Sequence, residues 1–380
     1  MPTNPTHILI APDKFKGSLS ALQVCEAIAG GIKKVLPKTT FDFAPLADGG
    51  DGSVRILAEA LKLEERRLQV QDPLGRPVMA SYYFSGTDAY VEMAAASGLV
   101  LLEPDERNPL LTSTYGTGQL MRHAIDHGAR RVFLFLGGSA TNDGGMGLAE
   151  ALGFQFLTAD GETLSAKGEA LGAVAKITGP KDNLLGEVEI QCMCDVLNPL
   201  LGKNGATYVY GPQKGADAQA LQQLESGMEN YAHQLAQYAG KPVHEVPGGG
   251  AAGGISAGLM ALCDASINSG IEAIQQWIQL EERIQQADLI ISGEGKIDEQ
   301  TLEGKVVAGV LELAQKYSKP TVLMVGKNDL VDWPVQLPQP QAIMAVMERA
   351  QNEADAMQNA AAYLNELATE YFDSKRTPHR

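Results

Sequence analysis

Short apolar runs alternate with helical stripes of apolar residues over the first 65 positions. An apolar run over 7–11 is followed by a polar loop over 13–18 and then by apolar residues at helical spacing. The same order returns with an apolar run over 41–46, a Gly- and Asp-rich loop over 48–53 and a second helical stripe. Two strand–loop–helix units in series predict a parallel sheet whose strands end in ligand-binding loops.

The pattern changes in the middle of the chain. Short alternating runs over 68–70, 78–84 and 90–93 are separated by turn residues, which predicts hairpins and not crossover helices. Two further apolar runs, over 132–136 and 188–194, predict buried strands. The middle of the chain therefore predicts a domain of mixed α/β structure.

The parallel-sheet pattern then returns near the end of the chain. Apolar runs over 288–291, 321–325 and 342–346 predict three more strands, and a helical stripe follows the first of them. The expected fold is α/β. A Rossmann-like parallel-sheet domain is built from both chain ends, residues 1–66 and 275–380, and a mixed α/β domain over 67–274 is inserted between them. The active site is expected in the cleft between the two domains.

Composition restricts the classes of function. The 380 residues carry a formal net charge of -16, which disfavours binding to nucleic acid or to an anionic membrane. Two of the four cysteines, Cys192 and Cys194, lack zinc-site spacing and are interpreted as core thiols. The chain shows no signal peptide and no apolar run of the roughly 20 residues that a membrane helix needs. A cytoplasmic protein is expected.

Several predicted strands end in loops that combine Gly with Asp, Glu or Lys. Backbone N–H groups in such loops bind phosphates, and carboxylate oxygens suit Mg²⁺, so the loops favour Mg-nucleotide chemistry. The alternative is that these are ordinary turn residues. The known nucleotide-binding signatures do not choose between these two interpretations. A P-loop needs Ser or Thr after Gly-Lys, but Val306 follows Gly304 and Lys305. Residues 248–253 match the dinucleotide-binding pattern, but no second signal supports this match.

The loops resemble those of the bacterial type-1 glycerate kinase family. Seven motifs carry this resemblance and cover nearly the whole chain in order, at 11–20, 47–52, 137–145, 194–200, 211–216, 247–254 and 293–301. The resemblance implies a two-domain α/β enzyme that uses ATP and Mg²⁺ to phosphorylate D-glycerate, with 2-phosphoglycerate favoured over 3-phosphoglycerate as product. The sequence leaves the oligomeric state open, and a homodimer is one option.

Phosphoryl transfer needs positioned cations, a metal site and a proton acceptor, which suggests roles for the loop residues. Asp195 is the expected base, and the alternative is that it closes a turn with Asn198. Lys16 is the expected cation for anionic oxygens, and the alternative is a solvated lysine. Further binding candidates are Lys14, Ser18, Ser139, Asn142, Lys214 and Lys305. The metal candidates are Asp48, Asp51, Asp143, Glu294 and Asp298, each with a turn carboxylate as the alternative.

Two other functions fit the same loops. A lyase or isomerase acting on phosphate compounds would use similar anion-binding loops without a nucleotide. A nucleotide sensor would bind without turnover. The many carboxylates in Gly-rich loops favour turnover over sensing, and ADP release that depends on glycerate separates the kinase from both alternatives.

Overall fold

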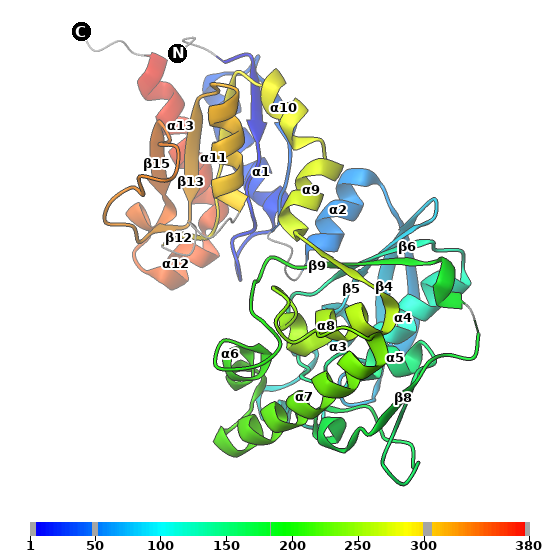
Figure 1. Ribbon diagram of the computed structural model, residues 1–380. Helices are drawn as coiled ribbons and strands as arrows, with labels where there is room; N and C mark the ends of the chain where they lie inside the picture. Colours follow the sequence, from blue (N-terminus) through cyan, green and yellow to red (C-terminus); the bar gives the residue numbers. More distant parts are fainter. Residues whose placement is uncertain (1–4, 48–51, 183, 299–305, 377–380) are drawn as a thin grey trace. The chain divides into compact units, whose positions relative to one another are not determined.

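The computed structural model describes residues 5–47, 52–182, 184–298 and 306–376 (Figure 1). The chain forms two compact units, the first from residues 1–48 and 271–380 and the second from residues 49–270. Each unit has its own sheet and its own hydrophobic core.

The first unit contains a five-stranded sheet in which every pair of neighbours is parallel. The strand order is β15-β13-β11-β1-β2. Along the chain, β2 is added on one side of β1, and β11, β13 and β15 are then added in turn on the other side. The order therefore reverses between β1 and β11, and such a switch point is where ligands bind in open α/β sheets. The strands are β1 (His7–Ile10), β2 (Thr40–Phe43), β11 (Leu289–Ser292), β13 (Thr321–Val325) and β15 (Ala342–Ala345).

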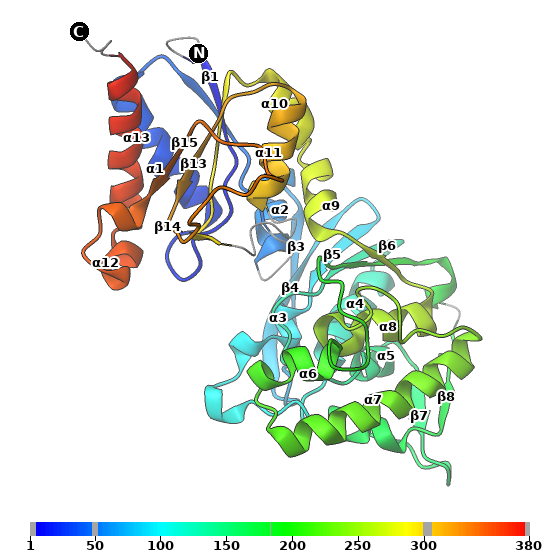
Figure 2. The same cartoon turned by 60° about the vertical axis from the view of Figure 1, so that its left-hand side comes forward.

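Helices cover both faces of this sheet. On one face, α1 (Ala21–Val35) and α13 (Ala360–Arg376) lie side by side over apolar residues of β1 and β11, whereas α10 (Leu280–Gln286) and α11 (Val306–Lys316) lie on the other face (Figure 2). The capping box expected at the start of α1 is confirmed, with Ser20 and Gln23 bonding reciprocally. The remaining helices are α9 (Gly270–Trp277) and α12 (Glu353–Gln358), and two short strands, β12 (Lys296–Ile297) and β14 (Lys327–Asn328), pair in parallel.

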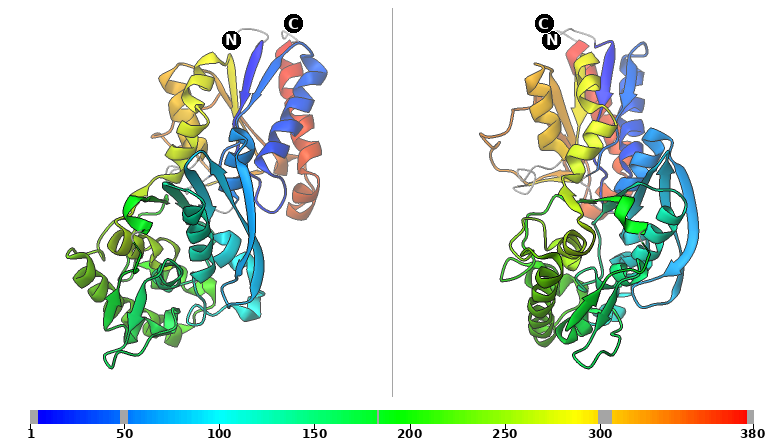
Figure 3. Two further views of the ribbon diagram at one scale, coloured as in Figure 1. Left: turned by 90° about the vertical axis from the view of Figure 1, so that its right-hand side faces the viewer. Right: turned by 45° about the vertical axis from the view of Figure 1, so that its right-hand side comes forward.

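The second unit contains a mixed six-stranded sheet in the order β10-β9-β6-β5-β4-β3. The expected hairpins are confirmed, because β3 pairs antiparallel with β4 and β4 with β5, whereas β5, β6, β9 and β10 run parallel. The long hairpin strands β3 and β4 are drawn in light blue in Figure 3. The strands are β3 (Glu64–Gln71), β4 (Pro77–Ser85), β5 (Asp88–Glu92), β6 (Arg131–Phe135), β9 (Glu189–Met193) and β10 (Ser266–Asn268), with β7 (Gln155–Leu157) and β8 (Lys176–Thr178) as a separate hairpin.

Four helices of the second unit pack in series away from the sheet. Helix α4 contacts β3, β4 and β5, α5 contacts α4, α8 contacts α5, and the long helix α7 contacts α8. The stripe expected to end at Gly240 forms α7, and Gly240 has the left-handed conformation that ends it. The helices are α2 (Ser53–Leu61), α3 (Ala94–Ser97), α4 (Tyr115–Asp126), α5 (Met146–Ala151), α6 (Ala206–Tyr210), α7 (Ala218–Ala239) and α8 (Ala251–Cys263).

The boundaries of the compact units differ from the expected domain boundaries. We expected residues up to 66 to belong to the first domain, but α2 groups with the second unit. Helix α2 contacts β5, and the backbone N–H of Gly52 donates to the carboxylate of Glu92 at the end of that strand. Strand order along the chain does not reveal this packing, because it depends on a contact over 40 positions.

Within the described ranges, no helix combines the length and the hydropathy needed to cross a membrane.

Candidate active site

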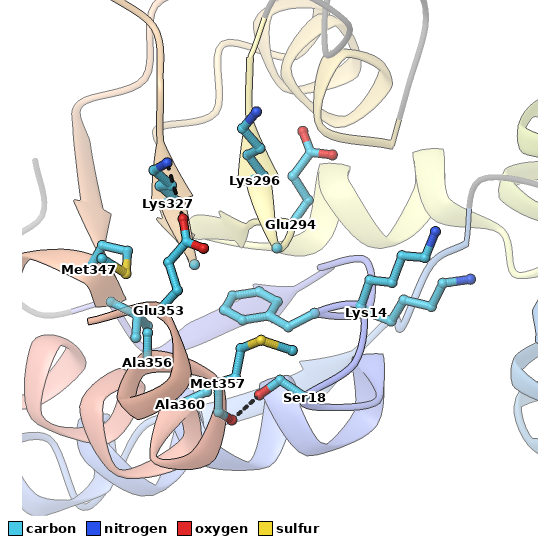
Figure 4. A pocket seen from close by; sticks show the side chains of 15 residues that line it. Lys14, Ser18, Glu294, Lys296, Lys327, Met347, Glu353, Ala356, Met357 and Ala360 are labelled. Carbon is cyan, nitrogen blue, oxygen red and sulfur yellow. Dashed lines mark hydrogen bonds and ion pairs between the residues drawn. The ribbon is translucent and has the colours of Figure 1, made fainter. Parts of the chain in front are cut away.

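Loops at the carboxyl ends of four adjacent parallel strands enclose a pocket of about 340 Å³ in the first unit (Figure 4). The loop after β1 contributes Lys14 and Lys16, and the loop after β11 contributes Glu294. The loops after β13 and β15 contribute Lys327 and Met347. The pocket thus lies where the strand order reverses, which is the expected position for a ligand in this fold.

Glycines allow the loop backbones to approach closely at the base of the pocket. A Cβ atom on Gly293 would lie 1.8 Å from the carbonyl oxygen of Met324, and one on Gly326 would lie 2.3 Å from that of Gly295. The loops are joined by backbone hydrogen bonds, from Gly326 N to Glu294 O at 3.1 Å and from Met347 N to Gly326 O at 3.0 Å. The Gly-rich motif therefore builds a preformed pocket.

The loop after β1 presents Lys16 at the tip of a tight turn. Phe15 and Leu19 are bridged across this turn, and Gly17 adopts a left-handed φ of 76°. The hydroxyl of Ser18 donates to the carbonyl oxygen of Met357 at 2.5 Å, which ties the turn to α12. The side chain of Lys16 is exposed and that of Lys14 is half-buried, and both residues line the pocket.

Two further lysines at the pocket form ion pairs with carboxylates. Lys296 contacts Asp298 and Asp329, each at 3.1 Å, whereas Lys327 contacts Asp329 at 3.2 Å and Glu353 at 3.4 Å. These pairs hold the pKa of Asp329 below its usual range, because hydrogen bonds from both lysines favour the charged carboxylate. Asp298, a metal candidate, is thus in contact with a lysine.

Asp195 lies in the second unit, two residues beyond the end of β9. Strand β9 runs parallel to β6 and β10, so Asp195 follows the carboxyl end of a parallel strand, as expected. The residue is exposed, and its carboxylate accepts a hydrogen bond from the hydroxyl of Ser269 at 2.6 Å. The side chain of Asn198 bonds to Tyr210 and to the carbonyl of Asn204.

Asp143 is fully buried at the N-terminal end of α5. Its Oδ2 accepts hydrogen bonds from the backbone N–H and hydroxyl of Thr114 at 2.8 and 2.7 Å and from Gly147 N at 3.2 Å, and its Oδ1 accepts one from Gly145 N at 3.2 Å. Burial raises the pKa of the carboxyl group, and these donors oppose the change. The contacts make Asp143 a support for the loop over 137–145.

Lys214 is also buried, with 2% of its surface exposed. Its Nζ donates to the carbonyl oxygen of Thr141 at 2.7 Å. The neighbouring Asn142 donates from Nδ2 to the hydroxyl of Thr207 at 3.2 Å, and its buried Oδ1 has no hydrogen-bond partner in the structure. Ser139 lies in the same loop and is 7% exposed. The structure thus brings three of the candidate binding residues together on or beside one loop.

Burial lowers the pKa of Lys214 from 10.5 to about 7, and the negative charge of Asp143 opposes the change. Between these two pH values the unfolded chain binds more protons than the folded chain, so the free energy of unfolding is expected to rise with pH. One group contributes at most about 1.4 kcal/mol per pH unit. Urea unfolding at pH 7.5 and 9.5 measures this slope, which should be flatter in Lys214→Met than in wild type.

The exposed Lys203 provides the matched control for this prediction. Lys203→Met removes a lysine whose side chain stays in water, so its pH slope should equal that of wild type. Equal slopes in Lys214→Met and Lys203→Met would contradict a low pKa at Lys214.

Three candidates, Asp48, Asp51 and Lys305, lie outside the described residues. Among the residues that are described, no group of three or more His, Cys, Asp or Glu side chains could hold a metal ion. A Mg²⁺ ion that arrives with a nucleotide needs only one or two protein carboxylates, because phosphates and water supply the remaining oxygens. Glu294, which lines the pocket and is 8% exposed, fits that requirement.

The dinucleotide-like motif does not have the geometry of a nucleotide-binding turn. No strand forms over 243–246, and Ala252, Gly253 and Gly254 all adopt left-handed conformations before the regular part of α8. A Cβ atom on Gly253 would lie 2.1 Å from the carbonyl oxygen of Thr141. These glycines therefore serve close packing against the loop over 137–145.

Sequence reasoning missed several residues of the site. Lys327 follows Gly326 directly after β13, so the rule that located the other loops could have found it. Ser269, which donates to Asp195, gave no signal because it lies 74 positions away. Met347, Ala356 and Met357 read as ordinary core or surface residues, and only the tertiary structure places them at the pocket.

Comparisons with known proteins agree with these observations. The model of the glycerate kinase family matches residues 8–374. The chain is 44% identical over 322 residues to a glycerate kinase of Halalkalibacterium halodurans, covering 84% of this chain and 85% of that protein. It is 42% identical to the glycerate 2-kinase of Escherichia coli K12, covering 84% of each.

A solved structure extends the agreement to the fold. A crystal structure described as a glycerate kinase 2 from Salmonella typhimurium LT2 superposes with a TM-score of 0.84 at 39% identity, and the match covers 98% of each chain. The α/β architecture with one parallel and one mixed sheet is the expected fold class, which this match confirms. The family match spans nearly the whole sequence, and the chain therefore belongs to the glycerate kinase family.

Proposed function

We propose that this protein is a glycerate 2-kinase that transfers the γ-phosphoryl group of ATP to D-glycerate and forms 2-phosphoglycerate. The match of the glycerate kinase family to residues 8–374 carries the proposal. The Escherichia coli relative, 42% identical, is named a glycerate 2-kinase, which favours the 2-position. A preformed pocket with lysines at the ends of parallel strands supports a phosphorylated substrate.

The proposed chemistry uses charge neutralisation and one proton acceptor. Lys16 and Lys14 bind anionic oxygens at the pocket, and the tie from Ser18 to Met357 holds their loop in position. Asp195 accepts the proton of the glycerate hydroxyl as the bond from oxygen to phosphorus forms. The hydrogen bond from Ser269 orients this carboxylate.

The loop over 137–145 supplies the other polar groups. Asn142 and Ser139 are proposed to contact the substrate, and Lys214 and Asp143 support them from inside the protein. Mg²⁺ bound with the nucleotide would offset the negative charge of the transferred group, and Glu294 would contribute a carboxylate oxygen to it.

A coupled assay of ADP release over a panel of hydroxy acids tests the proposed function. D-Glycerate should give the highest kcat/KM, and phosphorus NMR of the product should show phosphate on the 2-oxygen. Release of ADP without glycerate dependence, or turnover of phosphate compounds without ATP, would contradict the proposal. A 3-phosphoglycerate product would retain the kinase activity and reject the position.

A further inference from the structure

We propose that the pocket of the first unit binds the adenine base of the nucleotide between β15 and α12. This assignment rests on the proposed kinase function and adds the orientation of the nucleotide within the site. The pocket volume of about 340 Å³ is larger than a three-carbon acid requires and lies within the range of small-molecule binding pockets.

The two ends of the pocket differ in chemistry. One end is lined by the apolar side chains of Val346, Met347, Ala356, Met357 and Ala360, and the ion pair of Lys327 with Glu353 lies beside Met347. The other end carries Lys14 and Glu294, and Figure 4 shows the amino group of Lys14 at the side opposite Met347. A nucleotide has the same polarity, with an apolar aromatic base at one end and charged phosphates at the other.

The apolar end offers the contacts that a planar base requires. Val346 is 1% exposed and Ala360 is 2% exposed, so they form a firm wall, whereas Met357 is 48% exposed and has an adaptable thioether side chain. Small alanines at 356 and 360 leave room that larger side chains would fill. The apolar side chains at this end therefore suit a flat ring.

The charged end corresponds to the position of phosphates in related sheets. Lys14 and Lys16 follow β1 and Glu294 follows β11, and the strand order reverses between these two strands. Ligands bind at this reversal in open α/β sheets. Placing phosphates there directs the base toward β15 and α12, at the apolar end.

Binding of adenosine, which lacks phosphates and needs no metal, tests this assignment directly. Calorimetric titration of the full chain should show saturable binding, and adenosine should compete with ATP but not with glycerate. Ala356→Leu should fill the pocket, weakening adenosine binding and raising the KM for ATP by about 10-fold or more, the effect expected from blocking one apolar subsite. The KM for glycerate should change by less than about 2-fold.

Ala354→Leu provides the matched control, because Ala354 lies in the same helix, is exposed and does not line the pocket. It should bind adenosine and ATP like wild type. If Ala356→Leu lowers the melting temperature, Met357→Ala provides the second test, and it should weaken adenosine binding several-fold. Met79→Ala removes a methionine of similar exposure in the second unit and should not weaken adenosine binding.

Other results overturn the assignment. A folded Ala356→Leu with wild-type affinity for adenosine and wild-type KM for ATP would contradict it, and so would an increase in the KM for glycerate alone. If the wild-type protein releases no ADP in response to glycerate, the proposed function is contradicted. Adenosine binding measured in the same sample would still test the assignment of the pocket.

Discussion

Asp195→Asn is expected to lower kcat for glycerate phosphorylation by about 100-fold or more. Asparagine has nearly the same size and can still accept the hydrogen bond from Ser269, but it cannot take the proton of the substrate hydroxyl. The KM values for ATP and glycerate should change little, because the variant removes a proton acceptor and not a binding contact. Steady-state kinetics with each substrate varied in turn measures this.

The same variant separates base catalysis from two other roles. If Asp195 holds Mg²⁺, excess Mg²⁺ should restore part of the rate, and if it only braces its loop, the melting temperature should fall while the folded fraction keeps normal kinetics. Asp160→Asn changes an exposed turn carboxylate of the same unit and serves as the control. Full kcat in Asp195→Asn would reject Asp195 as the base.

Lys16→Ala is expected to lower kcat/KM by tens-fold, which corresponds to the loss of one charged hydrogen bond of roughly 1.5–3 kcal/mol. The exposed Lys16 lies at the tip of a turn that Gly17 and Ser18 fix independently of the lysine side chain. The melting temperature should therefore stay the same. Kinetics with ATP and glycerate varied separately show which substrate the lysine binds.

Two further variants serve as comparisons for this prediction. Lys16→Arg keeps the positive charge and should recover part of the lost activity. Lys38→Ala removes an exposed lysine that precedes β2 and does not line the pocket, so its kinetics should match wild type. Near-normal kcat/KM in Lys16→Ala would refute the assignment.

Local pattern predicted most of the secondary structure because each element has a short-range signal. The apolar runs over 288–291, 321–325 and 342–346 correspond to β11, β13 and β15. The Ser20 and Gln23 pair marked the start of α1, and Gly240 marked the end of α7. In each case the deciding interactions lie within a few residues of one another, so the sequence contains them directly.

The sequence also located the loops of the pocket but not how they contact one another. Glycines beside Lys and Glu at strand ends indicated anion-binding loops, and the parallel sheet brings those after β1 and β11 together. Strands that lie 281 positions apart bring these loops together, because β1 pairs with β11, and that pairing is a property of the folded sheet. The ion pairs of Lys296 and Lys327 likewise depend on the parallel pairing of β12 with β14.

The sequence by itself determined the α/β class, the resemblance to the glycerate kinase family and the loops that carry polar chemistry. The tertiary structure alone decided that Asp143 and Lys214 are buried supports, that α2 belongs with the mixed sheet and that Met347 and Ala356 line a pocket. The physical reason is that residue type and spacing report local propensity and amphipathicity. Burial and pocket shape instead arise from contacts between segments distant along the chain.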